Sequence, residues 1–155
     1  MSEISTVTVQ SIVTLQEITA ETVRAICNLS VTEAQKNFVA PNAISIAQAH
    51  FEPKAWFRAI YADDTPVGFV MLFDNPEKPI YFLWRFMIDT QYQKLGFGRQ
   101  AIQLLIDYVK TRPQATDLLV SYVPKEGGPG PFYHKLGFVP TGEMEGIEEV
   151  ASYKL

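Results

Sequence analysis

The segment from Gln93 to Arg99, which reads Gln-Lys-Leu-Gly-Phe-Gly-Arg, holds the residue types that could bind a phosphate group. Gly96 and Gly98 allow the backbone N–H groups to approach a ligand closely. A glutamine, a lysine and an arginine add side-chain donors, and a helix that begins here would add its free N–H groups and partial positive charge. The segment therefore predicts an anion site. A plain strand-to-helix turn built on two glycines is the alternative.

Two other phosphate motifs do not fit these residues. A Walker loop needs Gly-Lys-Ser/Thr at a fixed spacing, which is absent here. The dinucleotide fingerprint needs a third glycine, and position 101 is alanine.

The elements on either side of this segment are the clearest in the chain. Residues 80–88 are apolar at nearly every position, as expected for a central strand that is covered on both faces. From Arg99 to Lys110, apolar residues at helical spacing predict an amphipathic helix; they are Ile102, Leu105, Ile106 and Val109. The glycine segment is thus expected between a central strand and a helix N-terminus.

The other expected elements surround this unit. Residues 55–61 and 67–73 predict a hairpin, and Gly137 is placed to end a short helix in the left-handed conformation. Further strands are expected at 7–13, 118–123 and 148–155, and short helices from Thr19, within 32–38, after a cap at Asn42 and at 132–136. The chain is therefore expected to be an α/β (α+β) protein. Residues 1–155 are expected to form one domain, with a mixed, mostly antiparallel sheet of six or seven strands flanked by helices.

Composition excludes several classes of protein. A hydrophobic fraction of 47% and a net charge of −4 exclude a disordered tail and argue against nucleic-acid binding. No apolar run reaches the roughly 20 residues of a membrane span, and no secretion signal is visible, so we expect a cytoplasmic protein. Cys27 is the single cysteine, and His50 and His134 are isolated, so neither a disulfide nor a metal site is expected.

Three motifs resemble those of the GNAT superfamily of N-acetyltransferases. Gln93-x-x-Gly96-x-Gly98 resembles its Gln/Arg-x-x-Gly-x-Gly/Ala signature. The segment 86–89, Phe-Met-Ile-Asp, resembles the preceding strand, and Phe-Tyr-x-Lys-x-Gly-Phe at 132–138 resembles the C-terminal tyrosine helix and turn. Together with Val-Gly-Phe at 67–69, these motifs follow the family order from about residue 56 to 155.

The resemblance implies acetyl-CoA as co-substrate, no metal, and direct attack of an amine in a ternary complex. The backbone of the family's central strand, here Phe86, Met87 and Ile88, would pair with the pantetheine arm of acetyl-CoA. A backbone N–H near Met87 would stabilise the oxyanion that forms on the thioester carbonyl. The pyrophosphate would be held by the loop residues Gln93, Lys94, Leu95, Gly96, Phe97, Gly98 and Arg99. Tyr133 would be the general acid for the CoA thiolate. One departure is the Gly/Pro-rich loop 124–131, which stands where many members carry an Asn that binds pantetheine.

The acceptor is less defined by the residues. Glu33, Glu126 and Glu143 are candidates for the base, and Phe38 and Trp84 could line an acceptor channel, with Glu33 also a candidate substrate contact. The segment from residue 85 to 135 has seven basic and four acidic residues, and the remainder has six and thirteen. An acidic remainder with a charge of −7 suits a cationic acceptor.

The strand 84–89 and the 67–69 hairpin are most similar to those of bacterial spermine/spermidine (diamine) acetyltransferases, which implies a polyamine. Acetylation of a protein N-terminus or an amino sugar is one alternative. A CoA-binding regulatory module without turnover and a nucleotide-binding loop are others. A homodimer is compatible with the apolar stretches.

Overall fold

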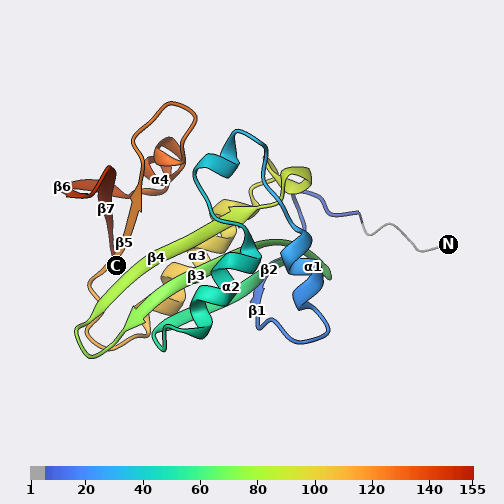
Figure 1. Ribbon diagram of the computed structural model, residues 1–155, viewed down its shortest axis with the longest axis horizontal. Helices are drawn as coiled ribbons and strands as arrows, with labels where there is room; N and C mark the ends of the chain where they lie inside the picture. The colour runs from blue at the N-terminus through green and yellow to red at the C-terminus, as the bar shows by residue number, and fades with distance from the viewer. Residues whose placement is uncertain (1–5) are drawn as a thin grey trace.

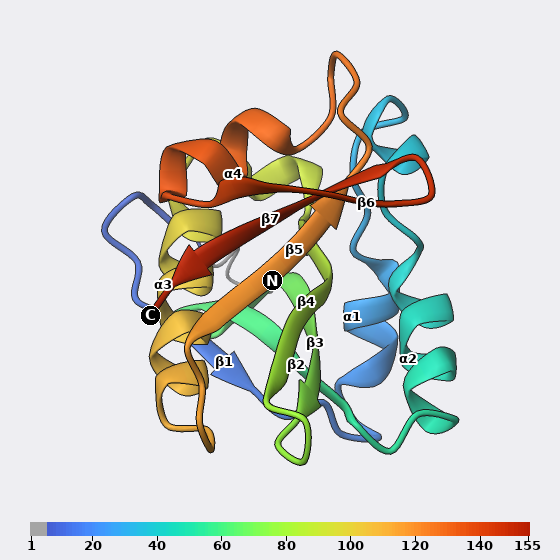
Figure 2. The same cartoon turned by 90° about the vertical axis from the view of Figure 1, so that its left-hand side faces the viewer.

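A seven-stranded mixed sheet, with helices on both faces, forms the described part of the chain, residues 6–155, in the computed structural model (Figures 1 and 2). The strands are β1 (Val13–Gln16), β2 (Ala55–Ala62), β3 (Thr65–Asn75), β4 (Ile80–Ile88), β5 (Asp117–Tyr122), β6 (Val139–Glu145) and β7 (Glu148–Lys154). The helices are α1 (Val23–Asn28), α2 (Asn42–His50), α3 (Phe97–Lys110) and α4 (Gly130–Leu136), with 3-10 turns η1 (Gln35–Asn37) and η2 (Thr90–Tyr92). The strand order is β1-β2-β3-β4-β5-β7-β6, and only β4 and β5 pair in parallel. The predicted fold class is confirmed.

Two apolar cores lie on opposite faces of the sheet. On one face, α3 buries the predicted stripe Ile102, Leu105, Ile106 and Val109. On the other face, α1 and α2 cover Phe69, Met71 and Met87. Residues 80–88 form β4 over the whole predicted range because side chains on both faces of this strand find a core to enter.

The predicted hairpin and helix stop are also confirmed. β2 and β3 pair antiparallel through a turn in which Asp63 has a φ of 53°. Gly137, at a φ of 109°, ends α4 in the left-handed conformation, and the Phe138 N–H donates to the Tyr133 carbonyl at 3.1 Å.

Several sequence-based boundaries were wrong. Residues 7–12 are not a strand because the Ser11 N–H closes a turn on the Thr8 carbonyl, and the sheet begins at Val13. Asn42 does not cap α2 but lies inside it, where its Nδ2 donates to the Ile26 carbonyl at 2.9 Å and ties α2 to α1. Residues 32–38 form only η1.

β6 was missed because of its burial pattern. All seven of its residues are exposed, so the strand carries no apolar alternation in the sequence. Within residues 6–155, no helix has the length and apolar character that crossing a bilayer requires.

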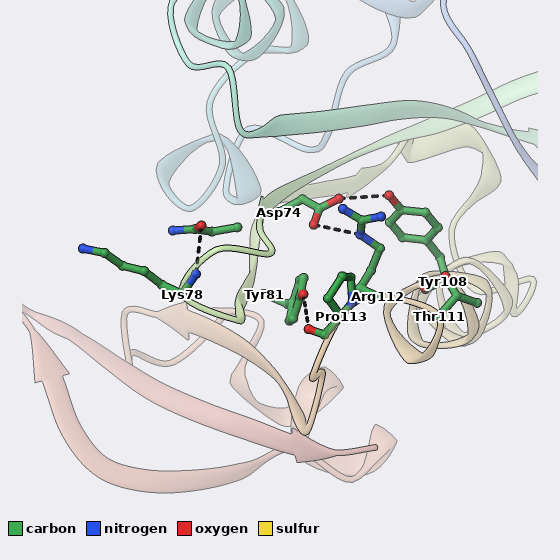
Figure 3. A network of polar contacts seen from close by, with 8 residues as sticks. Asp74, Lys78, Tyr81, Tyr108, Thr111, Arg112 and Pro113 are labelled. Carbon is green, nitrogen blue, oxygen red and sulfur yellow. Dashed lines mark hydrogen bonds and ion pairs between the residues drawn. The ribbon is translucent and has the colours of Figure 1, made fainter.

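A polar network fastens the end of β3 to the C-terminal end of α3 (Figure 3). Arg112 Nε donates to Asp74 Oδ1 at 3.1 Å, and the Tyr108 hydroxyl donates to Asp74 Oδ2 at 2.9 Å. Nearby, the Tyr81 hydroxyl donates to the Pro113 carbonyl at 2.6 Å. Burial, followed by the bond to Asp74, raises the pKa of Tyr108. The network fixes where α3 ends and β5 begins.

We expect Asp74→Asn to lower the free energy of unfolding by about 2 kcal/mol, because a largely buried carboxylate with two charge-assisted or polar partners is lost. Urea denaturation followed by circular dichroism measures this change. Asp64→Asn, in the exposed β2–β3 turn, is the matched control and should leave the midpoint unchanged. Equal midpoints for the two variants would contradict a stabilising role for the network.

Candidate active site

β4 and β5 part after a short parallel ladder. Their only Cα partners in the described chain are Phe82↔Leu119 and Leu83↔Val120. Beyond Leu83, β4 remains paired with β3 on its other edge, while the edge toward β5 has no strand partner. In Figure 1, β5 turns away from β4 toward α4. The Trp84 and Ile88 carbonyls accept from the Arg85 and Gln93 side chains. The other N–H and C=O groups that residues 84–88 direct to this edge have no strand partner and are available to an extended, amide-bearing ligand.

A β-bulge lies where the strands part. Met71 of β3 pairs with Arg85, and Leu72 pairs with Leu83, so Trp84 is the extra residue of β4. A bulge changes the direction of the backbone groups beside it. The first backbone donors of the open edge are thus aimed differently from those of a regular strand.

A cleft of about 1360 Å³ occupies this fork. One side of the cleft, called the donor side below because it carries the free backbone N–H donors, comprises the open part of β4, the segment from Tyr92 to Arg99 and the start of α4. The remaining wall comes from the η1 loop, the end of β5 and the β6–β7 turn. Of the predicted site residues, the following line it: Phe38, Trp84, Phe86, Met87, Ile88, Gln93, Lys94, Gly96, Phe97, Gly98, Arg99 and Tyr133.

The glycine segment forms the N-terminus of α3, as its spacing suggests. Gly96 is the N-cap with a φ of 84°, and Lys94 also has a positive φ, at 66°. A Cβ on Gly98 would lie 3.3 Å from the rings of Phe86 and Phe132, so this backbone packs tightly beneath the cleft. The N–H groups of the first turn of α3 have no partner within the helix and carry its positive dipole end.

The side chains of this segment differ in what they can do. The Gln93 amide Nε2 donates to the Ile88 carbonyl at 2.9 Å and to Gln35 Oε1 at 2.8 Å, so it joins two protein segments. Phe97 is buried, and Leu95 packs against the core and does not line the cleft. Only Lys94 and Arg99 extend exposed positive charge. The segment offers mainly backbone donors, as in the sequence-based hypothesis. The Gln93 side chain holds the segment to β4 and to Gln35.

These features fit the acetyl-CoA that the sequence motifs imply. The open edge of β4 matches the amides of a pantetheine arm, and the helix N-terminus with Lys94 and Arg99 matches a pyrophosphate. Among residues 6–155, no group of three or more His, Cys, Asp or Glu side chains is arranged to hold a metal ion.

Tyr133 lies against the donor side of the cleft. Its ring is 6% exposed and packs on Tyr122, Phe132 and Phe138 with centroid distances of 5.9, 5.3 and 5.5 Å. Its hydroxyl has no hydrogen-bond partner in the part of the chain that the structure describes. Burial raises the pKa of Tyr133, so the phenol keeps its proton at neutral pH.

The loop at 124–131 contributes backbone to the cleft. Gly127, at a φ of 84°, Gly128 and Pro129 line it. A Cβ on Gly128 would approach the Phe38 ring to 3.1 Å, so glycine here permits close contact with the η1 loop.

The structure does not bring the three proposed bases into the cleft. Glu33 is exposed and forms an ion pair with Lys36 at 2.6 Å. Glu126 lines a smaller neighbouring cavity, and Glu143 is exposed on β6. None of these three side chains lines the cleft.

Five charged residues that the sequence did not single out line the cleft instead; they are Lys36, Glu52, Arg85, Glu145 and Glu148. Glu148 Oε2 accepts a hydrogen bond from Ser121 Oγ at 3.3 Å. The Arg85 guanidinium donates to the Trp84 carbonyl and to Gln48 Oε1, both at 3.1 Å, while its buried Nε has no partner. No local motif marks these residues, because strand pairing between distant segments brings them together.

Residues 23–138 match the family model described as the Acetyltransferase (GNAT) family. A comparison with curated proteins finds no matching sequence.

Solved structures share the fold at low sequence identity. A domain from Methanocaldococcus jannaschii DSM 2661 has a TM-score of 0.76 and 12% identity, over 94% of this chain and 100% of that chain. A spermidine N-acetyltransferase from Vibrio cholerae has a TM-score of 0.71 and 16% identity, over 92% and 93%. The PaiA N-acetyltransferase from Thermoplasma acidophilum, solved with coenzyme A, has a TM-score of 0.69 and 14% identity, over 92% and 99%.

We expect Gly96→Ala to weaken coenzyme A binding about tenfold. A side chain in the left-handed conformation costs about 1–2 kcal/mol, and the loop can relieve this strain only by moving its N–H groups. Isothermal titration calorimetry measures the change. Gly142→Ala is the matched control, because Gly142 has a similar φ of 89° in open space on β6, away from the cleft. Unchanged affinity in Gly96→Ala would contradict the phosphate role of this segment.

Proposed function

Because this chain belongs to the GNAT family and is an acetyl-CoA-dependent acetyltransferase, we propose that it acetylates a primary amine of a small cationic acceptor such as a polyamine. The amine attacks the thioester directly while both substrates are bound. The observation that carries this proposal is the fork between β4 and β5, where an open backbone edge, a helix N-terminus and acidic side chains border one cleft.

The donor side is proposed to hold acetyl-CoA through the backbone. Phe86, Met87 and Ile88 would pair with the pantetheine amides along the open edge of β4. The N–H groups between Gln93 and Arg99 would bind the pyrophosphate. A backbone N–H near Met87 or the Trp84 bulge would stabilise the oxyanion that forms on the thioester carbonyl.

Tyr133 is proposed as the general acid. Its hydroxyl has no hydrogen-bond partner among residues 6–155, and its ring borders the donor side of the cleft, where the CoA sulfur would lie. Because burial raises the pKa of Tyr133, the phenol donates its proton only as negative charge develops on the departing sulfur. Transfer to the thiolate then coincides with cleavage of the C–S bond.

Charge on the acceptor side favours a cationic substrate. Outside the phosphate segment, the cleft is lined by three acids, Glu52, Glu145 and Glu148, and by two bases, Lys36 and Arg85, of which Lys36 is paired with Glu33. Phe38 and Trp84 supply apolar walls that suit the methylene chain of a polyamine. The spermidine N-acetyltransferase among the structural relatives is compatible with this class of acceptor but, at 16% identity, shares only the fold.

Arg85 favours a second candidate acceptor, an amine that also carries a carboxylate. Its guanidinium lines the cleft, and its buried Nε has no hydrogen-bond partner. A carboxylate on the acceptor would supply the missing oxygen, since guanidinium and carboxylate groups pair well.

We expect Tyr133→Phe to lower kcat about 100-fold, because a positioned general acid contributes at least that factor. A thiol-release assay with acetyl-CoA and spermidine measures the rate. Since burial raises the pKa of Tyr133, the wild-type rate should not fall from loss of this proton up to pH 10. The same variant should bind coenzyme A with unchanged affinity, and full activity in it would remove Tyr133 from the reaction.

An amine panel distinguishes the two acceptor classes. We expect turnover of spermidine and spermine. The KM of the polyamine should rise about 3- to 5-fold between low salt and 0.3 M salt, because screening weakens the attraction between the acidic wall and the cationic polyamine. Turnover of amino acids, together with no turnover of their amides or of polyamines, would replace the polyamine proposal with the Arg85-directed candidate. Coenzyme A binding without turnover of any amine would indicate a protein acceptor or a binding module.

A further inference from the structure

Glu148 stands at the point where the two central strands part. It is the first residue of β7, and it lines the cleft. Its Oε2 accepts a hydrogen bond from Ser121 Oγ, with 3.3 Å between the two oxygens. Ser121 is the residue of β5 directly after Val120, the last partner of β4. The carboxylate is therefore fixed beside the first open position of the fork.

Arg85 lines the same cleft from the other arm of the fork. Burial lowers the pKa of Arg85, and the negative charge of Glu148 opposes that change. Arg85 follows the Trp84 bulge by one residue, on the stretch of β4 where the backbone edge opens. Glu148 thus interacts with both strands that border the expected path of the acetyl-bearing arm.

The other carboxylates of the cleft lack this placement. Glu52 follows α2 and is bonded to the Lys54 N–H at 3.1 Å, away from the fork. Glu145 pairs with Glu148 across the β6–β7 turn but is exposed and has no side-chain partner in the described residues. Of the three, only Glu148 is bonded to a strand of the fork.

We propose that Glu148 is the general base that takes the proton from the acceptor ammonium, and that Ser121 is a positioning residue that orients its carboxylate. This inference rests on the proposed acetyl transfer and names the group that activates the amine. It holds for either class of acceptor, because both present an ammonium at neutral pH.

Glu148, Tyr133 and solvent account for every proton in this reaction. The ammonium gives one proton to Glu148, which releases it to solvent, and the free amine forms the N–C bond at the thioester carbon. As the C–S bond breaks, the CoA sulfur takes a proton from Tyr133. The second proton of the amine nitrogen is lost as the amide forms and restores the Tyr133 hydroxyl.

The test is the pH dependence of Glu148→Gln. A primary amine with a pKa near 10.4 is neutral in only about 1 molecule in 2,500 at pH 7. Without a base, only this fraction reacts, so kcat/KM should fall about 100- to 1,000-fold at pH 7. The deficit should then shrink by about tenfold per pH unit up to pH 9, as the free amine becomes more abundant. A variant that is merely misfolded would lose the same factor at every pH.

Three other charged residues lie near Glu148 and stay the same in the pH experiment. Arg85 lines the same cleft from β4, Glu145 lies across the turn on β6, and Glu149 follows it on β7. None of them changes in the Glu148→Gln variant, so the altered pH profile would report the loss of the Glu148 carboxylate itself.

Variants of Ser121 test its positioning role. Ser121→Ala should lower kcat about 5- to 20-fold with little change in the KM of acetyl-CoA, because the Glu148 carboxylate loses the hydrogen bond that orients it. Ser121→Thr keeps a hydroxyl at this position and should restore most of the rate. Equal losses in the alanine and threonine variants would overturn the positioning role.

Glu143→Gln is the matched control, since Glu143 is an exposed glutamate on β6 outside the cleft, and its rate should equal that of the wild type. Coenzyme A affinity is measured for every variant. A wild-type protein that binds coenzyme A but acetylates no amine would refute the proposed acceptor chemistry. A wild-type protein that does turn over, with a Glu148→Gln profile parallel to it, would refute the general base alone.

Discussion

The short parallel ladder between β4 and β5 is the constraint on which the site depends. β4 is held on its other edge by β3, and β5 is held along its whole length by β7, so neither strand can bend to meet the other. Phe86 of β4 stacks on Phe132 of α4 with a centroid distance of 5.7 Å, which attaches the start of α4 to the open part of β4. A fully paired sheet would satisfy every backbone group and would leave no path for a ligand.

The open edge gives the fold a binding surface that depends little on side-chain identity. Backbone N–H and C=O groups that lack a strand partner must bond to water or to a ligand. A pantetheine arm offers two amides that can pair with backbone groups, and a helix N-terminus attracts a phosphate whatever residues form it. Such a surface is compatible with chains of 12–16% identity sharing the fold.

The sequence predicts the elements whose signal is local. The apolar run at 80–88, the helical spacing that begins at Arg99 and the glycine at 137 each depend on neighbours within a few residues, and each is present in the structure. The predicted glycine segment and Tyr133 also carry local signals, and both line the cleft. Glu148 and Arg85 could not be found, because they meet only through the pairing of β5 with β7 and the divergence of β4. Glu33 was placed in the site by type alone, but its turn directs it to solvent.

The paired amides of Gln35 and Gln93 link the two halves of the cleft mechanically. Gln93 holds the end of β4 through the Ile88 carbonyl and, through Gln35, holds the loop that carries Phe38. A displacement at the end of β4 would therefore be passed to the Phe38 loop through one pair of side-chain amides, so these two walls of the cleft are coupled by hydrogen bonds and not by packing alone.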